Sequence, residues 1–349
     1  MIEREIQIRD IRHAEKPKDI KPDDITQEDV QNYRNTHNLG PHTNDDIIKQ
    51  ILIINRGGSV YGQENWNSKL DPNDKTTITY EGIRASHDFA NGLFEEASGS
   101  NNKNVYLFIP SPAGRTMETQ AVIQDRIEQL SERDESKQSN VVRLETIHDI
   151  SSEDLPDKKS IFLFQTQGAA DLGPVNNSVL DSVSKCFQDE TIGEMIWYAK
   201  PDEIEEIKRG AIKSNPESKQ LIGGIKSADY QIPPEEVVIR ILNFYRSLIE
   251  FTNNLPHDRD VHIICTSHNM ILDAVTIRLL DKEISAQSVK ELGEKAREPL
   301  EGSQISISGD KITIKHRGYE KSISLEDLAQ LITDLEKELE KRKKDWNIK

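Results

Sequence analysis

Short apolar runs separated by longer polar stretches predict the strands of this chain. The first run, residues 5–12, alternates the β-branched Ile6 and Ile8 with polar side chains and then adds Ile11, a pattern that suits a strand. The other strand candidates are continuous apolar runs, typical of strands buried on both faces of a sheet: residues 51–55, 105–109, 160–165 and 261–266.

Between these runs, apolar residues recur at helical spacing. The predicted helices are residues 26–35, 83–97, 117–130, 201–212 and 235–253. A charged loop is expected at residues 131–140. Strands that alternate with helices predict an α/β protein, here a three-layer sandwich with a mostly parallel central sheet and helices on both faces.

The last part of the chain has a different pattern. Isoleucines alternate with polar residues over 304–315, around Gly309 and Asp310, which predicts a late β-hairpin. A C-terminal helix follows, with apolar residues seven positions apart: Leu325, Ile332, Leu339 and Trp346. This helix either docks on its own domain or forms the seam of a homodimer.

Three of the predicted strands deliver a cation or an imidazole at their carboxyl ends. The first ends in Arg12 and His13, another leads into Arg115, and a late one leads into His268. Ligands of open α/β sheets bind outside the carboxyl ends of the strands, so we expect these side chains to meet around a common anion. His13 should then lie within about 10 Å of Arg115 or His268, because catalysis needs groups near hydrogen-bond reach.

These strand ends resemble the motifs of the histidine phosphatase superfamily, the phosphoglycerate-mutase-like fold. The R-H-G/A motif appears at residues 12–14, and S-P-x-x-R-x-x-E-T appears at residues 111–119 with every fixed position filled. The late S-H-G motif appears at residues 267–269, with Asn269 in place of Gly. The L-T-x-x-G-R helix start looks like residues 78–84, with one extra residue before the arginine.

The resemblance implies a role for each of these side chains. His13 would be the nucleophile that becomes phosphohistidine. Arg12 and Arg115 carry planar, permanently charged guanidinium groups that match phosphate oxygens. His268 would complete the phosphate cage, and Asn269 would bind phosphate beside it. No metal and no cofactor are required.

The general acid is harder to assign. Residues 187–197 loosely resemble the family segment that contributes it, which makes Glu190 the candidate to protonate the leaving oxygen. Asp189 could hold the same place, and Glu145 is a rival from another part of the chain.

A second stretch also resembles the family's opening motif. The apolar run at residues 51–55 leads into Arg56 and Gly57, with glycine where the histidine should be. If this copy were the true first strand, the protein would lack its nucleophile and would be catalytically inactive. Spacing to the helix start at Thr79 slightly favours this second copy. Residue chemistry favours the earlier one, because only Arg12-His13 supplies the imidazole and residues 26–29 could be that copy's own degenerate helix start.

The resemblance spans about residues 4–280. We therefore expect a single histidine-phosphatase-like domain over residues 1–320, with an insertion at about 17–77, followed by a C-terminal amphipathic helix over 321–349. Specificity in this fold rests on loops and insertions, and these match no pattern that names the substrate.

Composition narrows the classes of partner. The net charge of −16 argues against binding nucleic acid or an anionic membrane surface, because both need a basic footprint. The sequence has no apolar run long enough to span a membrane and no basic-then-apolar leader, so we expect a cytoplasmic protein. Cys186 and Cys265 are too few and too far apart to indicate a disulfide framework or a zinc site.

Together these features predict a phosphatase that hydrolyses a phosphomonoester through a phosphohistidine on His13. Its partner would be a phosphorylated small molecule or a phosphoprotein. Two alternatives stay open: a catalytically inactive, phosphatase-like interaction module, and a phosphomutase or phosphotransferase, which the same residues would equally support.

Overall fold

A computed structural model gives the architecture of the chain. It describes residues 6–12, 14, 25–36, 44, 48, 78, 80–99, 101–133, 139–146, 155–173, 195–199, 203–225, 232–292, 300–308 and 310–347. His13, Glu190, Asp189, Cys186 and the second opening motif at Arg56-Gly57 all lie outside these ranges.

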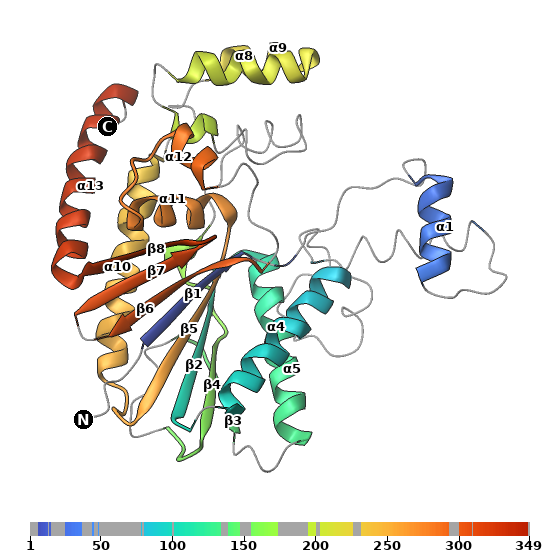
Figure 1. Cartoon of the computed structure of the whole chain (residues 1–349), viewed down its shortest axis with the longest axis vertical. Helices are drawn as coiled ribbons and strands as arrows, with labels where there is room; N and C mark the ends of the chain where they lie inside the picture. Colours follow the sequence, from blue (N-terminus) through green and yellow to red (C-terminus); the bar gives the residue numbers. More distant parts are fainter. Residues whose placement is uncertain are drawn as a thin grey trace.

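Within the described ranges, eight strands form one sheet at the centre of the molecule, in the order β3-β4-β2-β5-β1-β6-β7-β8 (Figure 1). Five strands run parallel: β1 (Ile6–Arg12), β2 (Lys103–Pro110), β3 (Ser139–Leu144), β4 (Ser160–Gln165) and β5 (Arg259–Ser267). Three antiparallel strands continue the sheet beyond β1: β6 (Gly302–Ser308), β7 (Lys311–His316) and β8 (Tyr319–Ser324).

Helices cover both faces of this sheet (Figure 1). On one face lie α4 (Tyr80–Gly99) and α5 (Gly114–Arg133), and on the other lie α10 (Pro234–Asn253), α11 (Asn269–Leu279) and α13 (Leu325–Trp346). The remaining helices and short 3-10 turns are α1 (Gln27–Thr36), η5 (Ala170–Leu172), α8 (Ile204–Ser214), η6 (Pro216–Ser218), α9 (Lys219–Gly224) and α12 (Ala286–Glu291).

Alternation along the central strands explains the two layers of core. In β2, Leu107 packs with α10 and α11, whereas its neighbour Phe108 packs with α4 and α5. The same alternation occurs in β5, where Ile263 faces the first group and Ile264 the second. Successive side chains of a strand point to opposite faces, so a continuous apolar run fills two cores at once. The predicted three-layer α/β sandwich is confirmed.

The C-terminal region agrees with its alternating pattern. β6 and β7 form the predicted hairpin, and β8 extends it to three strands. The helix α13 begins and ends at Leu325 and Trp346, the first and last residues of the predicted sevenfold pattern. It starts with a capping box in which Ser324 accepts from the Asp327 backbone N–H and Asp327 accepts from the Ser324 backbone N–H.

The apolar face of α13 packs on its own chain. Leu328, Ile332, Leu335 and Leu339 are buried, and α13 lies along α10. In this structure the predicted amphipathic helix therefore docks on its own domain. A homodimer through this helix stays a prediction, as does the domain boundary at residue 320.

The hydrophobic pattern of the sequence did not predict two of the strands, β3 and β8. Residues 131–140 were expected to be a charged loop, but β3 begins at Ser139, because the short segment Val141–Val142 pairs in parallel with β4. β8 contains a single aliphatic residue, Ile323, and it forms the outer edge of the sheet, where polar side chains are tolerated.

Cys265 is buried in β5, and burial raises the pKa of its thiol well above the usual value. It is thus an unreactive core side chain, as its place in an apolar strand predicts. Among the helices that the structure describes, none combines the length and the apolar character needed to cross a bilayer.

Candidate phosphate-binding site

The carboxyl ends of three neighbouring strands form the candidate site. Arg12, the last residue of β1, lies opposite Ser267 of β5, and Pro110, the last residue of β2, lies opposite Thr266. The backbone N–H of Ser111 donates to the carbonyl of Thr266 at 2.8 Å. The three segments that carry the motifs therefore leave the sheet side by side, at one edge.

Arg115 and His268 meet directly at this edge. Arg115 lies in the first turn of α5, and His268 is the residue that precedes α11, with extended backbone angles. Nη2 of Arg115 is 2.9 Å from Nδ1 of His268. The predicted convergence of these two side chains, 153 positions apart in the sequence, is thus confirmed.

A row of hydroxyl groups lies behind the histidine. The Oγ atom of Ser111 is 3.0 Å from Nε2 of His268 and 2.8 Å from Oγ1 of Thr116. The Thr116 hydroxyl donates to the carbonyls of Ala113, at 2.6 Å, and of Ser111, at 2.8 Å. Ser111 and Thr116 are fully buried, so these bonds are made without competition from water.

Thr119 connects α5 to the segment that follows β1. Its hydroxyl donates to the carbonyl of Arg115 at 2.7 Å and accepts from the backbone N–H of Ala14 at 3.0 Å. Arg12 and Ala14 are the two neighbours of His13 in the sequence. The described residues on either side of His13 are therefore fixed, one to β5 and the other to the helix that carries Arg115.

Glu118 has a structural part in the same motif. It is buried, and its Oε2 accepts from the backbone N–H of Ile78 at 3.0 Å, just before α4. The four motifs that were recognised in the sequence are thus joined to one another through α5. Arg84, the arginine of the helix-start motif, is exposed on α4.

Several predicted site residues are not tested. His13 and Glu190 lie outside the described residues, and of Asn269 the structure gives the backbone position, at the start of α11. The rival acid Glu145 is exposed after the edge strand β3. Glu145 follows β3, which lies two strand spacings, or about 10 Å at 4.8 Å per strand, from β2, the nearest strand of the site.

Gly168 supports the site from the next strand along the sheet. It lies in the turn after β4, and a Cβ atom at this position would be 2.3 Å from Cα of Pro112 and 2.7 Å from the carbonyl carbon of Ser111. The adjacent backbone N–H of Ala169 donates to the carbonyl of Pro110 at 2.8 Å. The absence of a side chain at Gly168 permits this close approach.

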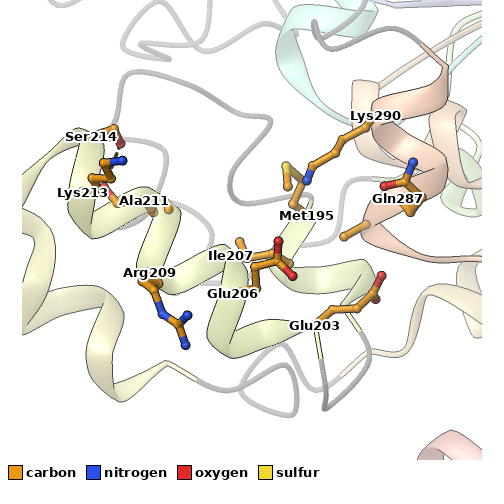
Figure 2. Close-up of a pocket in the computed structure, with 12 residues that line it drawn as sticks. Met195, Glu203, Glu206, Ile207, Arg209, Ala211, Lys213, Ser214, Gln287 and Lys290 are labelled. Carbon is orange, nitrogen blue, oxygen red and sulfur yellow. Dashed lines mark hydrogen bonds between the residues drawn. The ribbon is translucent and has the colours of Figure 1, made fainter.

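A separate cavity of about 520 Å³ lies between α8 and α12 (Figure 2). Cationic and anionic side chains both reach it, and Figure 2 shows Lys290 of α12 extending toward Met195. The charged side chains are Glu203, Glu206, Arg209, Lys213 and Lys290. Arg115, His268, Ser111 and Thr116 do not line this cavity.

No family model and no curated protein sequence match the chain. Several solved structures match it. The chain is similar to a mycobacterial hydrolase (11% identity, 95% of this chain and 98% of the other, TM-score 0.35). It is also similar to a mycobacterial glucosyl-3-phosphoglycerate phosphatase (10%, 87% and 90%, TM-score 0.32) and to phosphoglycerate mutase from Plasmodium falciparum (11%, 70% and 93%, TM-score 0.29).

The identities and TM-scores are low, so what this chain does has to be inferred from its own residues.

Proposed function

We propose that this chain is a phosphatase that hydrolyses a phosphomonoester through a phosphohistidine on His13. The observation that carries the proposal is the contact between Arg115 and His268, beside the strand end that holds Arg12. Two guanidinium groups and an imidazole at the ends of adjacent strands form a local positive site in a protein whose net charge is −16. Such a site fits a phosphoryl group.

The first step is attack by His13. A neutral imidazole nitrogen displaces the alcohol from phosphorus, which gives phosphohistidine and the leaving alkoxide. Arg12 and Arg115 hold the non-bridging oxygens and stabilise the charge that gathers on them in the transition state. Glu190, when protonated, gives its proton to the leaving oxygen, so the product leaves as an alcohol.

The second step discharges the enzyme. Water attacks the phosphohistidine, Glu190 as a carboxylate accepts the proton of that water, and inorganic phosphate and neutral His13 are released. His268 and Asn269 contact the phosphoryl group in both steps. Splitting one difficult displacement into two easier ones needs no metal ion and no organic cofactor.

The substrate is a phosphorylated small molecule or a phosphoprotein. A phosphotransferase would use the same first step and would differ in the second, where an alcohol replaces water. We place this activity in the cytoplasm as part of the proposal.

The test is covalent trapping. The protein is incubated with a ³²P-labelled aryl phosphate and quenched in alkali, and we expect a phosphoryl adduct that is stable in alkali and labile in acid. His13→Ala should abolish both the adduct and the hydrolysis. His257→Ala is the matched control, because this histidine is exposed on a turn after α10 and should leave both unchanged.

Two further arms separate the alternatives. Glu190→Gln should retain the adduct while turnover falls, and added alcohols should divert phosphate from water only in a phosphotransferase. Hydrolysis without an adduct, or an adduct that survives His13→Ala, would require another nucleophile. Phosphate binding without hydrolysis would favour the inactive interaction module.

A further inference from the structure

We infer that Ser111 is a positioning residue that holds His268 as the neutral tautomer with its proton on Nε2, and so makes Nδ1 the ring atom that meets the phosphoryl group. This inference rests on the proposed function for its catalytic consequence. The assignment of the tautomer follows from hydrogen-bond chemistry alone.

The argument begins with Arg115. A guanidinium group has five N–H donors and no acceptor, and it stays protonated in proteins. Its Nη2 lies 2.9 Å from Nδ1 of His268, so this contact is a hydrogen bond only if Nδ1 carries a lone pair. An imidazolium ring would instead set one N–H against another. His268 is therefore neutral here, with its proton on Nε2.

The Ser111 hydroxyl lies 3.0 Å from Nε2 and can accept this proton. Having accepted this bond, the hydroxyl donates its own proton to Oγ1 of Thr116 at 2.8 Å. Thr116 in turn donates to backbone carbonyls, that of Ala113 at 2.6 Å among them. Each hydroxyl accepts from the group before it and donates to the next, so the direction of the whole row is fixed at its carbonyl end. The Ser111 hydroxyl also accepts a longer bond from the backbone N–H of Ala113 at 3.4 Å.

Burial makes this orientation firm. Ser111 and Thr116 are fully buried and His268 is 6% exposed, so no bulk water can replace a missing partner on the Nε2 side. His268 also precedes the first turn of α11, whose backbone N–H groups form the positive end of the helix dipole. That field disfavours an imidazolium and adds to the effect of Arg115.

The consequence concerns the phosphoryl group. The row of hydroxyls ends at backbone carbonyls, so it orients the ring and does not conduct protons. Nδ1, on the side of Arg115, is the nitrogen that can accept a hydrogen bond from the P–O–H group of a phosphate monoanion. Ser111 acts through His268 and touches no substrate atom.

The first arm of the test is ¹⁵N NMR of the full chain with labelled histidine, with His268 assigned from the signals lost in His268→Asn. At neutral pH we expect a protonated Nε2 with a slowly exchanging proton, and an unprotonated Nδ1. Ser111→Ala should remove the exchange protection of that proton, and Ser111→Thr should restore it. A ring protonated on Nδ1 in the wild type would overturn the inference.

The second arm is kinetic, with Ser267→Ala as the matched control. Ser267 is as deeply buried as Ser111 and is adjacent to His268 in the sequence, but its hydroxyl donates to the carbonyl of Leu172 at 3.0 Å and does not contact the ring. Ser111→Ala should lower kcat about tenfold with little change in KM, the scale of one well-formed hydrogen bond. Equal kcat losses in Ser111→Ala and Ser267→Ala would overturn the positioning role.

A third variant tests the row itself. Thr116→Val removes the next hydroxyl and should lower kcat by a smaller factor, and its effect should not add to that of Ser111→Ala, because both act on the same ring. Additive losses would contradict a single row. A wild type without phosphatase activity would refute the proposed function, whereas the NMR signals would still decide the tautomer.

Discussion

The hydroxyl of Thr119 accepts a hydrogen bond from the backbone N–H of Ala14 at 3.0 Å, which ties the segment after β1 to the helix that carries Arg115. Thr119→Val keeps the shape of the side chain and removes the acceptor. Removing this acceptor from a buried backbone N–H should cost about 1–3 kcal/mol of unfolding free energy and should lower kcat. Thermal unfolding and aryl phosphate hydrolysis would measure the two effects.

A suitable control for that variant is Thr333→Val. Thr333 is exposed on α13 and donates to the carbonyl of Ala329 one turn earlier. Its unfolding free energy should change by no more than about 0.5 kcal/mol. If both variants behaved alike, the bond between Thr119 and Ala14 would have no special part in the site.

Arg115 should be sensitive to the shape of its cation. Arg115→Lys keeps one positive charge but loses the planar fork, so it should not restore activity to the level of the wild type. We expect kcat/KM for an aryl phosphate to fall about 100- to 1000-fold in Arg115→Ala, the usual effect of removing one group that stabilises transition-state charge. A lysine variant with wild-type kcat/KM would show that catalysis does not require the contact between the Arg115 guanidinium and His268.

Gly168 should not accept a side chain. In Gly168→Ala the new Cβ would lie 2.3 Å from the backbone of Pro112, so the turn that carries Ser111 must move. Overpacking of this kind costs about 1–3 kcal/mol, and activity should fall with stability. Gly92→Ala is the comparison: this glycine is inside α4 with nothing within 4 Å, and alanine there should stabilise by about 0.5–1 kcal/mol. Equal melting temperatures for the two variants would refute the steric argument.

The layers of the fold could be predicted from the sequence, but two strands of the sheet could not. Continuous apolar runs predicted β2, β4 and β5, because a strand that is buried on both faces of a sheet has apolar side chains at successive positions. β3 was missed because its burial is partial, and a short Val-Val pair between polar residues is weak evidence for any element. β8 was missed because an edge strand needs few apolar side chains.

For the site, motif spacing predicted which strand ends meet but not how the groups bond. Arg115 and His268 could be placed together from the sequence, since each follows a predicted strand. The bonds of Ser111 and Thr119 could not, because a hydroxyl in a motif gives no sign of the distant group that it contacts. The close approach of Gly168 to Pro112 likewise depends on which strands are neighbours in the sheet.

The ion pair between α10 and α13 leads to a prediction about pH. Nη2 of Arg342 lies 2.6 Å from Oε1 of Glu235, whose side chain is almost fully buried. Burial raises the pKa of Glu235 above its usual value of 4.5, and Arg342 opposes that shift. Removing the arginine in Arg342→Met leaves a buried carboxylate without its partner cation, which should cost about 3–5 kcal/mol at neutral pH.

The sign of the pH dependence follows from that raised pKa. The folded state binds the Glu235 proton more tightly than the unfolded state does, so the stability from this group is complete below pH 4.5 and is lost as pH rises through the folded pKa. Without Arg342 the pKa rises further, and the melting temperature of Arg342→Met should fall increasingly below that of the wild type between pH 4.5 and neutrality. Adding Glu235→Gln should abolish this slope and recover most of the stability.

The control is Lys343→Met, which breaks the more exposed pair with Glu236 and should cost at most about 1 kcal/mol. A deficit in Arg342→Met that is the same at every pH would mean that the arginine stabilises α13 by packing and not by its charge.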